Sequence, residues 1–326
     1  MPTVSMNDGL CTLDAGNGIM AQVASFGATL VDVRVPDRHG RIGSVVLGLD
    51  HIADYAHQRA FLGATVGRVA NRIRDARFSL NGHTYKLEAN DPPHHLHGGS
   101  NGWHRAHWQM QPLAGGEPAV TLTHRSPAGD AGYPGAVTAR VVYRLSHTGA
   151  LSIDMDGEVE QTTPLGLAPH AYFNLAGSGT VLEHQLTVMA QSYTPGDPLV
   201  PTGEIRPVAG SPLDYRTPRP VWPELDHNFV LDGHVGSMRP VARLFDPHSG
   251  RTLDVRSDQP GLQVYAGRFL DGSTTGRGFR HERHAGICLE TQAFPNAVNV
   301  PAWHAQVIRH PGETYRHRVV YAFGVA

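Results

Sequence analysis

Hydrophobic and polar residues alternate with a period of two along much of this 326-residue chain. Such alternation predicts β-strands with one buried face, because successive side chains of a strand point to opposite sides. The predicted strands lie at 18–35 (broken near Gly27), 44–49, 119–124, 136–145, 150–159, 225–231, 241–246, 251–256, 261–266, 286–291 and 315–323. Many short strands at regular spacing predict an all-β fold, a large antiparallel β-sandwich with few short helices. We expect residues 1–326 to form a single domain.

Three local patterns add detail to this prediction. Residues 78–87 carry Asn81-Gly82 between two short strands, the strongest hairpin signal in the chain. Asp50 is placed to cap a short helix, with apolar residues at helical spacing over 52–56. Pro and Gly concentrate over 194–223, which indicates a long irregular excursion at the surface.

The segment 286–296 places one carboxylate, Glu290, in an otherwise uncharged and largely apolar stretch. If residues 286–291 form a buried strand, Cys288, Glu290 and Gln292 share one face. A buried carboxylate must be paired, be hydrogen-bonded or have its pKa raised, and a raised pKa suits a general base working near neutral pH. A structural carboxylate bound to backbone N–H groups is the competing interpretation. The sequence leaves two alternatives for the side chain of Cys288: it lines the site, or it packs beneath the site.

Composition and charge restrict the function classes. The 27 Lys and Arg residues balance 29 Asp and Glu residues without a basic block, so neither nucleic acid nor an anionic membrane is an indicated partner. Two cysteines, Cys11 and Cys288, do not support a disulfide framework and are typical of reduced thiols. No signal peptide or membrane-length apolar run stands out, which favours a cytoplasmic protein.

The 21 histidines raise the question of a metal site. His95 and His97 have the spacing that puts two imidazoles on one face of a strand, as in metal enzymes of the cupin type. The surrounding Pro92-Pro93 and Gly98-Gly99 make the segment a loop instead, and no carboxylate follows at short range. We therefore expect no metal.

Acid–base chemistry without a cofactor is the other candidate. Glu290 is the candidate base and His170, in an apolar strand-like segment, is the candidate acid, although a lone buried histidine is more often structural. Asp226, Asn71 and Arg72 are candidates for binding hydroxyl groups, and each also has an ordinary structural interpretation.

Two tryptophans, Trp103 and Trp108, suit either stacking on a sugar or packing in the core. No Gly-x-Ser-x-Gly elbow or phosphate loop is present, so nucleophilic hydrolysis and nucleotide chemistry are disfavoured.

Seven segments in order resemble the aldose 1-epimerase family, the galactose mutarotases. They are Gly67-Arg68-Val69-Ala70-Asn71-Arg72-Ile73, Leu96-His97-Gly98-Gly99, His170-Ala171-Tyr172-Phe173-Asn174-Leu175, Leu225-Asp226-His227-Asn228-Phe229, Leu262-Gln263-Val264-Tyr265 with Phe269-Leu270-Asp271-Gly272, Cys288-Leu289-Glu290-Thr291-Gln292 and Pro311-Gly312-Glu313-Thr314-Tyr315. Each segment alone is weak evidence, whereas seven in order over most of the chain are specific for the superfamily.

The resemblance implies a β-sandwich enzyme that needs no cofactor and acts on a small monosaccharide. It implies that Glu290 takes the proton from the anomeric hydroxyl while His170 protonates the ring oxygen. The ring opens to the aldehyde, rotates about C1–C2 and closes as the other anomer. By the same resemblance the sugar hydroxyls are held by Asn71, Arg72, His97, Asp226 and Gln263. A monomer or a homodimer is expected.

The chain departs from the family pattern at three positions, Pro169, Ala293 and Asn296, where the family has Asn, His and Asp. None removes a proposed catalytic group, so the departures bear on which sugar is preferred.

Two alternative functions stay open on the sequence. A non-catalytic sugar-binding protein on the same fold would need the hydroxyl-binding residues without the acid–base pair. A hexose-6-phosphate epimerase would need converging cations, for which Arg68, Arg72 and Arg74 are candidates.

Overall fold

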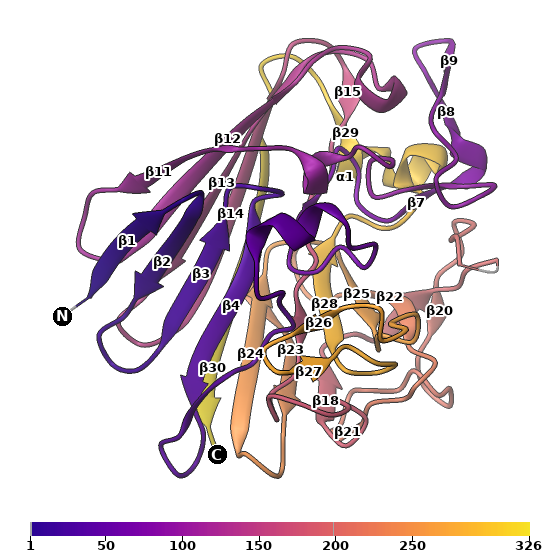
Figure 1. The fold of residues 1–326 in the computed structure, drawn as a ribbon. Helices are drawn as coiled ribbons and strands as arrows, with labels where there is room; N and C mark the ends of the chain where they lie inside the picture. Colours follow the sequence, from indigo (N-terminus) through magenta and orange to yellow (C-terminus); the bar gives the residue numbers. More distant parts are fainter. Residues whose placement is uncertain (1, 198) are drawn as a thin grey trace.

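Antiparallel pairing joins most strands into three sheets over residues 2–197 and 199–326, the part of the chain that this computed structural model describes (Figure 1). The five-stranded sheet runs in the order β1 (Thr3–Asn7), β2 (Leu10–Asp14), β3 (Met20–Ala24), β4 (Thr29–Pro36) and β5 (Ile42–Ser44). The nine-stranded sheet runs β11 (Gln109–Leu113), β12 (Ala119–Ser126), β13 (Val137–Leu145), β14 (Ala150–Val159), β30 (Tyr315–Val325), β24 (Arg251–Ser257), β23 (Arg239–Phe245), β18 (Gln185–Val188) and β21 (Arg219–Pro220). The six-stranded sheet runs β17 (Tyr172–Phe173), β28 (Ile287–Gln292), β25 (Gly261–Tyr265), β22 (Asp226–Val230), β19 (Ser192–Thr194) and β20 (Arg206–Pro207).

The smaller elements lie around these sheets. Two-stranded pairs are formed by β7 (Arg72–Ile73) with β10 (His95–Leu96), β6 (Thr65–Val66) with β16 (Ala168–Pro169), β15 (Thr163–Pro164) with β29 (Ile308–Arg309), β8 (Arg77–Leu80) with β9 (His83–Lys86), and β26 (Thr275–Gly276) with β27 (Phe279–Arg280). The helical elements are α1 (His304–Val307) and the 3₁₀ turns η1 (Ile52–Ala56), η2 (Arg74–Ala76), η3 (Trp103–Arg105), η4 (Asp130–Gly132), η5 (Ala297–Asn299) and η6 (Pro301–Trp303).

The nine-stranded sheet forms one layer, and the other two sheets pack against it. Strands β2 and β3 contact β12 and β13, and β4 contacts β30, so the indigo strands lie beside the magenta ones in Figure 1. The six-stranded sheet meets β30 through the Phe173 and Tyr321 rings, whose centroids are 4.9 Å apart. One hydrophobic cluster draws members from all three sheets, which confirms the predicted antiparallel β-sandwich.

The segment after β5 connects the two smaller sheets. Alternation predicts a strand over 44–49, but β5 ends at Ser44 and Val46 instead forms an isolated antiparallel bridge with Phe173. The main chain of Leu47 then donates to the carbonyl of Tyr172 at 2.9 Å. The predicted strand residues therefore leave the edge of one sheet and pair with β17 of the other.

Two local predictions had different outcomes. The Asn-Gly hairpin is confirmed, since β8 and β9 pair around Asn81 and Gly82, both with positive φ as a type I′ turn requires. The capping role of Asp50 is wrong: the short helix is the 3₁₀ turn η1, its first flanking residue is His51, and it has no side-chain cap. The Asp50 carboxylate instead accepts a hydrogen bond from the backbone of Arg277 at 3.0 Å.

In the part of the chain that the structure describes, no helix has the length and apolar character needed to cross a membrane.

Candidate active site

The register of the six-stranded sheet puts polar side chains on one face. Cys288 lies opposite Tyr172 on one neighbouring strand and Tyr265 on the other, and Glu290 lies opposite Gln263. Because side chains two residues apart share a face, these five point to the same side of the sheet. Each strand alone supplies one or two polar side chains, and antiparallel pairing assembles them into a site.

A cavity of about 450 Å³ lies over this face. That volume falls in the usual range for a small-molecule site. Its lining is formed by Arg59, Ala60, Phe61, Asn71, Arg72, Asp91, Leu96, His97, His170, Tyr172, Leu199, Asp226, Gln263, Tyr265, Phe269, Leu270, Asp271, Ser273, Thr274 and Glu290. All seven residues predicted from the sequence to act on the sugar are among them.

Glu290 and His170 form a buried titratable pair in this cavity. Their side chains are 3% and 5% exposed, and the Nε2 of His170 lies 3.8 Å from the Oε2 of Glu290. Burial, repulsion from Asp226 and attraction to Arg72 act on Glu290 in that order of size, and together they raise its pKa well above 4.5. Burial lowers the pKa of His170 to about 4. The two shifts act in opposite directions, so a single proton on this pair lies on Glu290 rather than on His170.

The Glu290 oxygen that lies nearest to His170 has an unused acceptor position. Within the described chain, Oε2 of Glu290 accepts no hydrogen bond although it is fully buried. A buried carboxylate oxygen without a partner is costly unless it is protonated or a ligand supplies the missing hydrogen. The site is therefore preorganised to receive a hydroxyl group between Glu290 and His170.

Two neighbouring loops position His97 beside this pair. Asn71 and His97 both adopt left-handed backbone conformations, with φ of 61° and 50°, and their main chains pair with each other. The loop needs glycine at Gly98, where a Cβ would lie 1.9 Å from the carbonyl oxygen of Gly67. The ring of His97 thus lies 5.1 Å from that of His170, nearly perpendicular to it.

The main chain also sets the proton position on His97. The N–H of Asn71 donates to Nδ1 of His97 at 3.1 Å, and burial lowers the pKa of His97 well below 6.5. A neutral imidazole whose Nδ1 accepts carries its hydrogen on Nε2. His97 is therefore a hydrogen-bond donor, matched to the oxygen atoms of a sugar.

Two ion-paired or hydrogen-bonded groups complete the polar lining. Nε of Arg72 donates to Asp91 at 2.6 Å, which fixes the guanidinium at one edge of the cavity. On the other edge, Nε2 of Gln263 donates to Asp226 at 2.7 Å, and Arg268 lies 3.8 Å from the same carboxylate. These contacts hold each side chain in one orientation, and the remaining donor and acceptor positions can bind hydroxyl groups.

The three residues His97, His170 and Glu290 also bring potential metal ligands within 4.8 Å of one another. These side chains do not favour a metal ion. Nδ1 of His97 accepts from Asn71, so Nε2 carries a hydrogen and has no lone pair to offer a metal. The metal pair considered from the sequence has a different geometry. His95 points elsewhere, with its ring against Tyr133 and its Nδ1 at 2.7 Å from the carbonyl of Glu88.

Other candidates from the sequence lie outside the cavity. Trp103 and Trp108 are core residues that pack on each other at 5.8 Å, so the sugar-stacking alternative is wrong for both. The three arginines considered for a phosphate site do not converge. Arg68 is buried against the carbonyls of 134 and 135, and Arg74 donates to the carbonyl of Val200, so Arg72 is the one of these three that lines the cavity.

The three residues that depart from the family pattern also lie outside the cavity lining. Pro169 belongs to the pair β6–β16, and Asn296 bonds to the main chain of Arg74 and of Pro201. Neither these two residues nor Ala293 is among the lining residues. Any effect that they have on sugar preference is indirect.

Sequence reasoning missed several lining residues. The ring of Phe61 lies 4.7 Å from His97, 4.7 Å from His104 and 5.6 Å from His170, so it covers the histidines from one side. Phe269 lies at the mouth with 62% of its surface exposed. Phe61 occurs in an irregular stretch with no motif around it, whereas Phe269 stands next to Asp271 in a segment that the family resemblance already marks.

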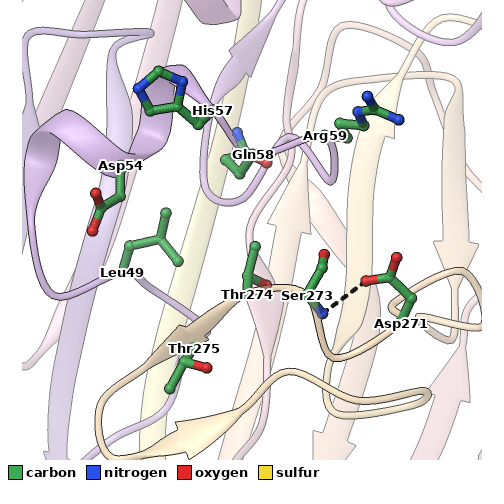
Figure 2. A pocket seen from close by; sticks show the side chains of 9 residues that line it. All are labelled: Leu49, Asp54, His57, Gln58, Arg59, Asp271, Ser273, Thr274 and Thr275. Atoms are coloured by element: carbon green, nitrogen blue, oxygen red, sulfur yellow. Dashed lines mark hydrogen bonds between the residues drawn. The ribbon is translucent and has the colours of Figure 1, made fainter.

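A second cavity of similar volume adjoins the first (Figure 2). It is lined by Leu49, Asp54, His57, Gln58, Arg59, Asp271, Ser273, Thr274 and Thr275. These residues come from η1 and the segments on either side of it, and from the chain that leads into β26. Figure 2 shows the backbone N–H of Ser273 hydrogen-bonded to the carboxylate of Asp271. We call this the side cavity and the first one the main cavity.

Comparison with known proteins agrees with this geometry. The family model described as aldose 1-epimerase matches residues 9–322. A galactose mutarotase from Bos taurus is 41% identical over 94% of this chain and 92% of its own length, and the one from Homo sapiens is 39% identical over the same shares. An aldose 1-epimerase from Escherichia coli K12 is 32% identical over 96% of this chain and 94% of its own.

Solved structures give the same result for the fold. A GalM/aldose epimerase homologue from C. elegans superposes with a TM-score of 0.91 at 29% identity and covers both chains completely. A galactose 1-epimerase from Lactobacillus acidophilus NCFM superposes with a TM-score of 0.85 at 27% identity, covering all of this chain and 98% of its own.

Proposed function

The chain belongs to the aldose 1-epimerase family, and we propose that Glu290 and His170 carry out its reaction, interconversion of the α and β anomers of a free aldose. The observation that carries this proposal is their buried contact of 3.8 Å with opposed pKa shifts. One group must remove a proton and the other must deliver one in the same step, and a pair holding one proton can do both.

The reaction begins with the sugar between the two side chains. In the reactive form the shared proton is on His170 and Glu290 is a carboxylate. Glu290 takes the proton of the O1 hydroxyl, the C1–O5 bond breaks as C1=O1 forms, and His170 delivers its proton to O5. Rotation about C1–C2 presents the other face of the aldehyde. The O5 hydroxyl then attacks C1, returning its proton to His170, while Glu290 protonates O1.

The remaining residues hold the sugar while it turns. Asn71, Arg72 and Asp226 bind hydroxyl groups, Gln263 orients Asp226, and Nε2–H of His97 donates to an oxygen near the ring. D-galactose is the first substrate to test, because the relatives from Bos taurus and Homo sapiens are named galactose mutarotases. The reaction needs no cofactor, so dialysis against a chelator leaves the rate unchanged.

Polarimetry tests the proposal directly. Freshly dissolved α-D-galactose, α-D-glucose and L-arabinose are followed with the wild-type protein, with Glu290→Gln and with buffer alone. Acceleration by wild type and not by Glu290→Gln supports the proposal and ranks the sugars. Full activity in Glu290→Gln would contradict it, and sugar binding by calorimetry without acceleration would indicate a binding protein.

A further inference from the structure

The two ring nitrogens of His170 face different partners. Nε2 faces Glu290 in the main cavity, whereas Nδ1 lies 3.6 Å from the sulfur of Cys288 on the closed side. Cys288 is fully buried and does not line the main cavity, so it cannot touch the sugar. An effect of the cysteine on the reaction must therefore pass through His170.

The proposed reaction requires one particular tautomer of His170. After it gives a proton to O5, the neutral ring must have a bare Nε2 that can take the same proton back. The hydrogen must then stay on Nδ1 in both charge states, which requires an acceptor beside Nδ1. The main-chain carbonyl of His170 is one acceptor near the ring, and one of its two lone pairs is taken by the N–H of Gly63 at 3.0 Å.

We propose that the sulfur of Cys288 is this acceptor, and that Cys288 is a positioning residue which keeps Nε2 of His170 as the proton-exchanging nitrogen. The register supports this role, because Cys288 pairs with Tyr172 and precedes Glu290 by two residues, so it faces His170 diagonally across β17 and β28. The inference rests on the proposed acid–base function of His170.

Burial keeps the Cys288 thiol neutral. Burial raises the pKa of Cys288 well above 9.0, and a hydrogen bond with the side chain of Tyr172 acts in the opposite direction. The pKa of Tyr172 is also raised by burial, so both groups stay neutral. A neutral thiol keeps lone pairs on its sulfur, and one of them can accept the Nδ1–H of His170 at the observed 3.6 Å.

A neutral acceptor also explains why a carboxylate is not used here. A negative charge at Nδ1 would raise the pKa of His170 and keep it protonated, so it would take back a proton from O5 too readily and release one too slowly. The titratable groups around the ring are Glu290 and Cys288 on β28, Tyr172 on β17, His97 after β10 and, beyond Phe61, His104 on η3. Only Glu290 among them carries a charge in the reactive form.

The test compares Cys288→Ala with Cys288→Ser, which lose nearly the same volume but differ in the acceptor. We expect Cys288→Ala to lower kcat about five- to tenfold with little change in KM, which is the size of one modest hydrogen bond. Cys288→Ser should recover kcat to within about threefold of wild type, since its hydroxyl oxygen accepts from Nδ1–H. Equal kcat in the Ala and Ser variants would overturn the proposal.

A measurement on the wild-type protein does not depend on how the variants fold. Nitrogen-15 NMR distinguishes a protonated from a bare ring nitrogen, and the signals of His170 are assigned by their loss in His170→Asn. We expect hydrogen on Nδ1 of the neutral ring. Hydrogen on Nε2 would overturn the role of Cys288 and leave the proposed function standing, whereas inactive wild-type protein or active Glu290→Gln would count against the function itself.

Discussion

The main cavity and the side cavity have nearly the same volume, about 450 Å³, and share part of their lining, yet their chemistry differs. Glu290 and His170 are buried on or beside paired strands of the six-stranded sheet. In the side cavity, Asp54 lies on the 3₁₀ turn η1 and His57 directly follows it, and both side chains are exposed. Volume alone therefore does not identify the active site.

The two cavities differ because the main cavity removes a titratable pair, Glu290 and His170, from water and holds it at a fixed distance. Water stabilises the charged form of an exposed carboxylate or imidazole and screens the interaction between two such charges. In the main cavity burial pushes the pKa of Glu290 up and that of His170 down, and the sheet fixes their distance. The following substitutions test this difference, from the largest expected effect to the smallest.

Glu290→Gln should have the largest effect. The amide keeps the shape of the side chain but can neither remove nor return a proton, so we expect kcat to fall about 10³-fold or more. Polarimetry with α-D-galactose measures the rate, and the melting temperature serves as the control for folding. A loss of less than tenfold in a well-folded variant would show that another group is the base.

His170→Asn should lower kcat by about 10²- to 10³-fold, because the ring oxygen loses its proton donor while Glu290 stays in place. Stopped-flow polarimetry would separate kcat from KM. A rise of KM with unchanged kcat would instead assign His170 to sugar binding.

Asp226→Asn should have an intermediate effect and a diagnostic pH dependence. The charge of Asp226 helps to raise the pKa of Glu290, so its removal lowers that pKa and moves the alkaline limb of kcat/KM to lower pH. We also expect KM to rise about tenfold from the weaker hydroxyl contact. If the alkaline limb stayed at its wild-type pH, the charge of Asp226 would have no effect on the pKa of Glu290.

Asp54→Asn in the side cavity should have the smallest effect. Asp54 lines the side cavity and not the main one, so we expect kcat/KM within about twofold of wild type. A tenfold loss for any of the three sugars would extend the functional site into the side cavity.

The sequence predicts those structural features that depend on residues close together in the chain. Alternation in 286–291 correctly places Cys288 and Glu290 on one face, and the Asn-Gly turn correctly predicts β8 and β9. Family motifs predict which residues belong to the sugar site, and the structure brings all of them to one cavity. Their individual roles stay predictions until the variants are measured.

The sequence does not predict contacts made over long separations. Nothing near Asp50 indicates that its carboxylate would bond to Arg277 instead of capping η1. Arg68 stands in a motif beside Asn71 and Arg72, yet its side chain turns into the protein to bind main-chain carbonyls. Such outcomes depend on which strands and loops meet, and pairing is decided by the whole core.

The central claim is that burial raises the pKa of Glu290 and lowers that of His170, so that one proton passes between them during the reaction. The most direct test is kcat/KM of the wild-type enzyme against pH, with the buffer rate subtracted at each point. At low pH a second proton enters the pair near the lowered pKa of His170, about 4, and at high pH the pair loses its last proton at the raised pKa of Glu290. We therefore predict an acid limb near pH 4 and an alkaline limb well above 4.5, the ordinary pKa of a glutamate side chain. A narrow bell confined between the ordinary values of 4.5 and 6.5, or a profile without limbs, would contradict the account.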